Sequence, residues 1–355
     1  MTYHPVVRLA LAITVIALLV ALPLGLNRYG IYILSMWAVM TIAAIGLNLT
    51  LGYAGQVSLA QGAFVGIGAY ATGILITAHH WPLLAIVPVA ALLCFVIGWG
   101  LGVPALKVQH HYLAFVTLAF STLAFLIFRN EEWLTHGVYG IEGIARPGFL
   151  AALPVPGGLS KPIRTALAYY YLCLAALLAV TCAVWWLVRS PWGRAFLALR
   201  ENPVRALSLG VDTRRYTLMA FAIGSALGGI SGVFYAPLVE FIEPGAFTPT
   251  LSLNILMMVI VGGSGYFLGP FLGALIAVLL PEWLRFTQGY YLILYALLVI
   301  ALLVFSPRGI LGAIEGWIED RRTRRASALR AAATAQIQIP HETPTIGHEP
   351  TGGRP

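Results

Sequence analysis

Long apolar runs constrain this chain more than any other feature of its sequence. A helix that crosses the hydrocarbon core of a bilayer needs about 20 predominantly apolar residues, and runs of comparable length, separated by charge, proline or glycine, recur along the chain. They lie at residues 9–26, 31–51, 58–78, 82–103, 112–128, 166–188, 216–238, 249–264, 268–284 and 290–305. The sequence therefore predicts an all-α, polytopic helical bundle with about ten transmembrane spans.

The composition excludes the other broad classes of protein. Hydrophobic residues make up 59% of the 355 residues and charged residues only 10%, whereas soluble domains are about 45–50% apolar and about 25% charged.

The first run lacks a convincing A-x-A-like cleavage site near Leu22 and Pro23 and is followed by many more runs, so we interpret it as a retained helix.

The distribution of lysine and arginine predicts the orientation. If ten spans start from an internal N-terminus, fifteen of these residues lie inside and six outside. The inner ones are Arg8, Lys107, Arg189, Arg194, Arg200, Arg205, Arg214, Arg215, Arg308, Arg321, Arg322, Arg324, Arg325, Arg330 and Arg354, and the outer ones are Arg28, Arg129, Arg146, Lys161, Arg164 and Arg285. An excess of Lys and Arg marks the cytoplasmic side, so both termini are expected there. The net charge of +8 then reports topology and gives no case for nucleic-acid binding.

The same pattern predicts the domain organisation. Residues 1–305 form a transmembrane domain, with an outward-facing loop at 129–165 that is long enough for a short surface helix and a cytoplasmic loop at 189–215. Residues 306–355 form a cytoplasmic tail, whose Arg-rich stretch at 321–330 is expected to meet anionic lipid and whose last fifteen residues are expected to be disordered.

The sequence lacks the residues that several kinds of binding and catalysis require. The only lysines, Lys107 and Lys161, do not follow glycine, so the P-loop that binds ATP phosphates is missing. Both aspartates, Asp212 and Asp320, lie outside the apolar runs, and the three cysteines have no metal-binding spacing. We therefore predict neither an enzyme nor a metal or cofactor site. Every Glu and Asp falls in a loop, at the edge of a run or in the tail, which also argues against an ion-coupled carrier.

The first informative segment, at residues 46–70, combines polar and glycine residues within apolar sequence. Its polar side chains, Asn48, Gln56, Ser58 and Gln61, must face protein or water at membrane depth. Gly52 and Gly55 are expected to break the helix, and Gly66 is one of several glycines that allow close helix approach. Helix packing alone also explains the glycines, but for the polar residues we favour a lined substrate pathway.

A second glycine-rich break follows the eighth run. It contains Gly262, Gly263, Gly265 and Gly269. In the predicted topology both breaks follow an inward span and precede an outward one, and interrupted helices in matching positions of two halves point to a transporter's binding site.

The cytoplasmic loop contains the third informative segment. Pro203 at its start and Gly210 just beyond its end predict a short helix over 203–209. A basic amphipathic helix can simply lie on the lipid surface. We favour the alternative, in which it docks onto a cytoplasmic partner.

Together these segments resemble the LivM-type permease subunit of ATP-binding-cassette (ABC) importers for branched-chain amino acids. The resemblance rests on four stretches, at 46–70, 200–211, 252–274 and 306–312, in order and spacing. It departs from the family pattern at Ala60-Gln61-Gly62, and the general importer motif E-A-A-x-x-x-G is degenerate here, with Val204 in the place of its Glu. By position, the resemblance assigns coupling to the ATPase to Glu201, Asn202, Arg205, Ala206 and Gly210.

The resemblance implies a subunit of the inner membrane with four kinds of partner. These are a paralogous LivH-type permease, two cytoplasmic ATP-binding subunits, a periplasmic substrate-binding protein and membrane lipid. The expected function is import of branched-chain or related amino acids by alternating access driven by the ATPases. The alternative is a stand-alone secondary carrier or channel for a small neutral solute such as urea or an amide.

Overall fold

The computed structural model describes residues 5–105, 110–148, 161–284 and 309–316, with isolated positions between 290 and 304. One compact unit extends to Gly312, and the rest of the chain forms a second unit. The predicted run at 290–305, the tail from 306 onward and residues 149–160 of the predicted periplasmic loop therefore lie wholly or largely outside the described residues.

Helices dominate the described residues, as predicted. The apolar ones are α1 (Pro5–Ala21), α2 (Arg28–Leu47), α3 (Gln61–Thr77), α4 (Leu83–Ala105), α5 (His110–Asn130), α7 (Lys161–Arg189), α10 (Thr213–Val239), α11 (Pro249–Gly262) and α12 (Gly269–Leu284). The connecting elements are η1 (Leu22–Gly25), η2 (Asn48–Tyr53), α6 (Glu132–Thr135), η3 (Gly137–Tyr139), β1 (Ile141–Glu142), α8 (Pro191–Glu201), α9 (Pro203–Ser208), β2 (Phe241–Ile242) and η5 (Pro244–Phe247). Five helical segments of the described residues are long and apolar enough to cross a membrane, in agreement with the expected all-α, multi-pass membrane protein.

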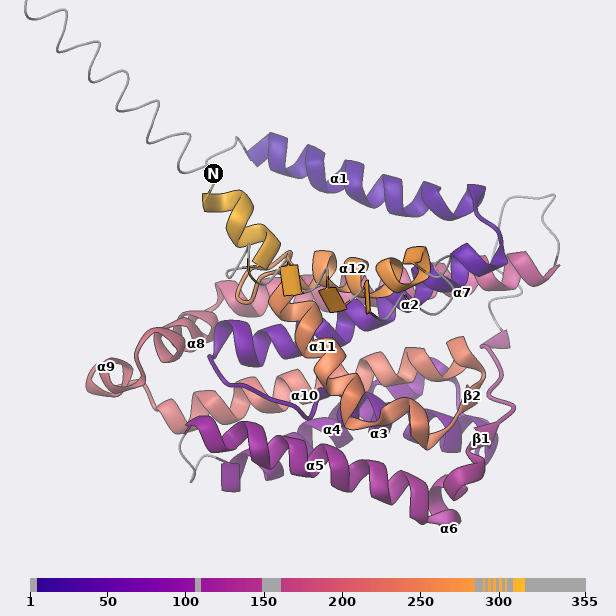
Figure 1. Cartoon of the computed structure of the whole chain (residues 1–355), viewed down its shortest axis with the longest axis horizontal. Helices are drawn as coiled ribbons and strands as arrows, with labels where there is room; N and C mark the ends of the chain where they lie inside the picture. The colour runs from indigo at the N-terminus through magenta and orange to yellow at the C-terminus, as the bar shows by residue number, and fades with distance from the viewer. Residues whose placement is uncertain are drawn as a thin grey trace, which may run out of the picture. The chain divides into compact units, whose positions relative to one another are not determined.

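Helix α10 packs against α2, α3 and α4 (Figure 1), and glycines allow the backbones to come close. A Cβ added at Gly224 would lie 2.7 Å from the carbonyl oxygen of Gly46 on α2, and the reverse distance is also 2.7 Å. Between α3 and α10, Cβ atoms at Gly68 and Gly232 would collide with backbone atoms of the opposite helix. Without a hydrophobic driving force in lipid, such close packing is a main source of helix association.

Helices α11 and α12 form a tight pair that is shorter than a full span. They have 14 and 16 residues, which at 1.5 Å per residue makes them about 21 Å and 24 Å long, against about 30 Å of hydrocarbon. A Cβ on Gly273 would collide with the carbonyl group of Met258, so only glycine permits this approach.

The two ends of the long helices carry different elements. Helices α8 and α9 lie at one end, and β1, β2 and α6 lie at the opposite end (Figure 1). Strand β1 pairs with β2 in antiparallel register, Ile141 opposite Ile242, and so ties the loop after α5 to the chain that leaves α10. The described part of this loop contains one single-turn α-helix, α6.

Candidate functional site

The first helix break begins with a π-helix. Helix α2 continues into η2, which is π-helical over Asn48–Tyr53, and α3 starts only at Gln61. Short π-helical turns are rare and frequently occur at functional sites. Gly55 has a φ of +70°, which favours glycine, and a Cβ on Gly52 would collide with the backbone nitrogen of Gly265.

The second break separates α11 from α12. Gly263 and Gly265 have φ angles of +113° and +84°, so both adopt conformations that L side chains rarely reach. Gly262 and Gly269 face each other, and a Cβ on Gly262 would collide with the carbonyl group of Gly269. The chain therefore reverses direction within a few residues.

Asn48 joins the two breaks. Its amide nitrogen donates to the carbonyl oxygen of Tyr266 at 3.0 Å, and its amide oxygen accepts from the backbone N–H of Gly265 at 2.9 Å. The side chain is buried, at 3% exposure. Two segments that the sequence identified separately, 217 positions apart, thus form one site.

Arg200, at the end of α8, reaches the same place. Its guanidinium group occupies the position that a Cβ on Gly265 would take, and its Cα would lie 3.3 Å from a Cβ on Gly55. We call Asn48, Gly52, Gly55, Arg200 and Gly265 the break junction. Sequence reasoning did not single out Arg200, because nothing distinguishes it there from the other arginines of the 189–215 loop.

The break junction leads directly into the loop helix predicted over 203–209, which is found as α9. Asn202 separates α8 from α9 and caps α9, accepting from the backbone N–H of Arg205 at 3.0 Å. Ala206 is buried, Glu201 is exposed, and Gly210 ends the turn with a φ of +82°. Three apolar side chains are mostly exposed here: Val204 at 74%, Leu207 at 62% and Leu209 at 82%.

The remaining predicted polar residues are buried along the first break. Gln61 donates its amide N–H groups to the carbonyl oxygens of Ala43 on α2 and Gly224 on α10, at 3.0 and 3.1 Å. Ser58 accepts from the backbone N–H of Ala60 at 3.3 Å. The backbone N–H of Gln56 donates to Thr50 at 2.8 Å, and its side chain is also buried. These bonds fix the segment between η2 and α3.

A hydroxyl cluster at the start of α3 was missed by sequence reasoning. The backbone N–H of Gly62 donates to Oγ of Ser252 on α11 at 2.9 Å, and that hydroxyl lies 3.3 Å from Oγ of Ser121 on α5. Thr117, one turn from Ser121, accepts from the backbone N–H of Leu59 at 2.9 Å. The i, i+4 spacing of Thr117 and Ser121 within an apolar run was the available signal. Gly66, a turn further along α3, faces the rings of Phe128 and Phe247.

Helices long and apolar enough to cross a membrane, two helix breaks that meet, and an adjoining loop helix with exposed apolar side chains characterise the described residues as a multi-pass membrane protein. The chain belongs to the family described as the permease component of branched-chain amino acid transport systems, whose family model matches residues 29–305.

Individual relatives agree with this assignment. The chain is 30% identical over 313 residues to the high-affinity branched-chain amino acid transport system permease protein LivM of Escherichia coli, covering 84% of this chain and 74% of that protein. It is 31% identical over 315 residues to LivM of Salmonella typhimurium, covering 85% and 74%. The autoinducer 2 import system permease protein LsrC of Salmonella typhi is 25% identical over 291 residues, covering 76% and 75%. No solved structure matches the chain.

Proposed function

We propose that this chain is a translocating subunit of an ABC importer for branched-chain or related amino acids. It spans the inner membrane about ten times with both termini in the cytoplasm, as a permease domain at 1–305 and a basic tail. It works with a paralogous LivH-type permease, two cytoplasmic ATP-binding subunits and a periplasmic substrate-binding protein. The observation that carries the proposal is the break junction, where the end of α8 touches both helix breaks.

Helix α9 is the docking element for an ATP-binding subunit. It exposes Val204, Leu207 and Leu209, and exposed apolar groups beside polar ones mark interaction surfaces. Arg205 and Glu201 flank these groups and are available for the polar rim of an interface. Asn202 and Gly210 define its two ends.

Arg200 transmits the movement of α9 to the membrane helices. When the ATP-binding subunits close, α9 moves with them, and α8 shifts the guanidinium group that rests against Gly265 and the backbone beside Gly55. Because Asn48 connects η2 to the same glycine turn, both breaks respond together. The pathway runs beside the segment that contains Gln56, Ser58 and Gln61. These three polar side chains are buried, and they change their hydrogen-bond partners when the pathway opens.

The substrate class is supported by the relatives and by charge. The LivM relatives are named for branched-chain amino acids, and the spans described here contain few ionised side chains. A zwitterion with no net charge needs no fixed counter-ion along such a pathway.

The test uses the assembled transporter in lipid vesicles, with ATP hydrolysis and uptake of leucine measured as the loaded binding protein is added. We expect Arg200→Ala to lower the stimulation of ATP hydrolysis roughly fivefold or more, the lower range of typical coupling free energies, while the complex still assembles. Arg194→Gln, an exposed arginine on the same helix, is the matched control and should leave stimulation unchanged. Equal stimulation in Arg200→Ala and wild type would overturn the coupling role, and purification without ATP-binding subunits would favour a stand-alone carrier.

A further inference from the structure

A pocket with two arginines lies at the end of α2 and α10 that is remote from the break junction. Its volume is about 390 Å³, within the range of ligand pockets, roughly 300–1,000 Å³. Its lining includes Arg28 and Tyr32 of α2, Arg146 of the loop after β1, Tyr169 of α7 and Glu240 at the end of α10. We call these five residues the arginine pocket. A second cavity, of about 490 Å³, shares both arginines and Glu240.

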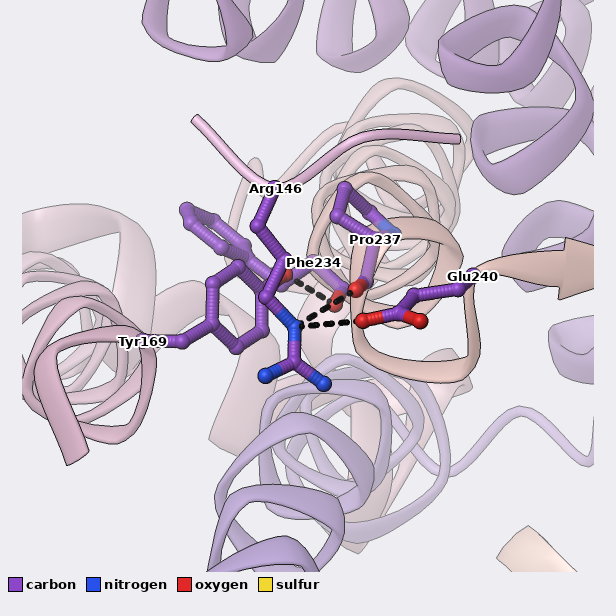
Figure 2. A network of polar contacts seen from close by, with 5 residues as sticks. All are labelled: Arg146, Tyr169, Phe234, Pro237 and Glu240. Atoms are coloured by element: carbon purple, nitrogen blue, oxygen red, sulfur yellow. Dashed lines mark hydrogen bonds and ion pairs between the residues drawn. The ribbon is translucent and has the colours of Figure 1, made fainter. Parts of the chain in front are cut away.

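Arg146 is held in a fixed position by its neighbours. Its Nε forms an ion pair with a carboxylate oxygen of Glu240 at 3.0 Å and donates to the carbonyl oxygen of Pro237 at 3.4 Å (Figure 2). The guanidinium lies 5.5 Å from the ring centre of Tyr169, whose hydroxyl donates to the carbonyl oxygen of Phe234 at 2.6 Å. The guanidinium is therefore oriented before any ligand arrives, which reduces the entropy cost of binding.

The two terminal nitrogens of Arg146 remain available. Figure 2 shows them pointing away from both of the bonds made by Nε, and within the described part of the chain they have no hydrogen-bond partner. A guanidinium edge of this kind binds a carboxylate through two parallel hydrogen bonds. The contacts of Nε and of the Tyr169 ring are enough to hold the loop against α10, so this structural role does not require the terminal nitrogens of Arg146.

Arg28 adds a second positive charge to the same pocket. It is the first residue of α2, it is exposed, and the described residues offer it no ion-pair partner. The start of a helix also favours anions. With Glu240 the three charged groups sum to +1, and Glu240, whose side chain is 52% exposed, remains accessible to an ammonium group.

Apart from Ser35, the other walls of the pocket are apolar. They are formed by Ile31, Ala166, Leu238 and Val239 together with the tyrosine rings. We propose that the arginine pocket binds a free α-amino acid with an apolar side chain. The two arginines hold the carboxylate, Glu240 faces the ammonium group, and the apolar wall contacts the side chain. This inference rests on the proposed function and adds a binding site at the end expected to face the periplasm.

The experiment is protection of arginines from phenylglyoxal in the assembled transporter without its binding protein, read by mass spectrometry. At leucine about ten times its dissociation constant, modification of Arg28 and Arg146 should slow about tenfold, as mass action requires. Leucinol, which lacks the carboxylate, should not protect. Arg129, an exposed arginine of α5 outside the pocket, is the internal control. Absence of protection, or equal protection by inorganic phosphate, overturns the proposal.

A fold-neutral variant gives a second measurement. Arg28→Gln should lower leucine uptake at limiting substrate about tenfold, the effect of losing a charge-assisted hydrogen bond, whereas Arg129→Gln should not change uptake. Unchanged uptake in Arg28→Gln overturns the proposal even if Arg146 proves necessary for folding. Failure of the wild-type complex to import any amino acid would overturn the proposed function, whereas normal import with unprotected arginines would overturn this inference alone.

Discussion

The two ends of α2 and α10 are held by different kinds of contact. At the break junction, backbone groups of glycines meet one amide side chain and one arginine. At the other end, the β1–β2 pair and the ion pair of Arg146 with Glu240 fasten the loop to α10. At the junction the backbones meet so closely that an added Cβ would collide, whereas at the other end strand pairing and side-chain contacts hold the loop. The comparison thus sets a junction of close backbone contacts against an anchored end that is held by a strand pair and an ion pair.

The largest expected effect comes from filling the junction. Gly265→Ala forces a φ of +84° on a side chain that would also collide with the Arg200 guanidinium. The left-handed conformation costs about 1–2 kcal/mol, and overpacking costs about 1–3 kcal/mol more. We expect a stability loss of several kcal/mol, measured by thermal unfolding of the complex, together with loss of substrate-stimulated ATP hydrolysis.

The matched control for Gly265→Ala is at the opposite end. Gly143 has a similar φ of +74°, but a Cβ there meets nothing within 4 Å. Gly143→Ala should therefore lose only the stability that a left-handed conformation costs, about 1–2 kcal/mol. Stimulation of ATP hydrolysis by the substrate should be kept. If the two variants lost the same amount of stability, crowding at the junction would not explain the effect of Gly265→Ala.

Removing the link between the breaks has the next largest effect. Asn48→Ala deletes two hydrogen bonds that join η2 to the 263–269 turn, each contributing about 0.5–1.5 kcal/mol. We expect a stability loss of about 1–3 kcal/mol and weaker ATPase stimulation, measured on the same complex.

Asn27→Ala is the control for Asn48→Ala, because the two asparagines lie at opposite ends of α2. The side chain of Asn27 caps α2, accepting from the backbone N–H of Gly30 at 2.8 Å. A lost cap costs about 0.5–2 kcal/mol and should spare the stimulation. If Asn27→Ala uncouples the ATPase as strongly as Asn48→Ala does, the two ends do not differ in function.

Local patterns predicted the helices, whereas the contacts between distant segments had to come from the structure. Hydropathy and length are properties of a single run, so the apolar runs through 284 emerge as helices. The same counting did not reveal that, among the described residues, four of the nine apolar helices are shorter than a standard span. The π-helical turn of η2 was also missed, because a π-turn has no simple residue pattern.

The break junction shows where sequence reasoning stopped. Both glycine breaks were recognisable, since glycines and polar groups inside apolar runs are unusual. That they share Asn48 as a common link depends on how distant helices pack. The glycines of α10 were a missed signal, because Gly224, Gly228 and Gly232 repeat every four residues, the spacing of close helix pairs in membranes.

The smallest expected effect tests the anchored end. Glu240→Gln keeps the shape of the side chain and removes its charge from the pair with Arg146, whose side chain is 14% exposed. Because Glu240 is half exposed, the pair contributes only about 0.2–1 kcal/mol. The melting temperature should fall by about 1–4 °C, and the difference from wild type should shrink at 1 M salt, where the screening length is about 3 Å. Glu142→Gln, an exposed glutamate of β1 at the same end, should leave the melting temperature unchanged. A loss of several kcal/mol that persists at high salt would show instead that the anchored end depends on the geometry of the contact between Glu240 and Arg146 more than on its charge.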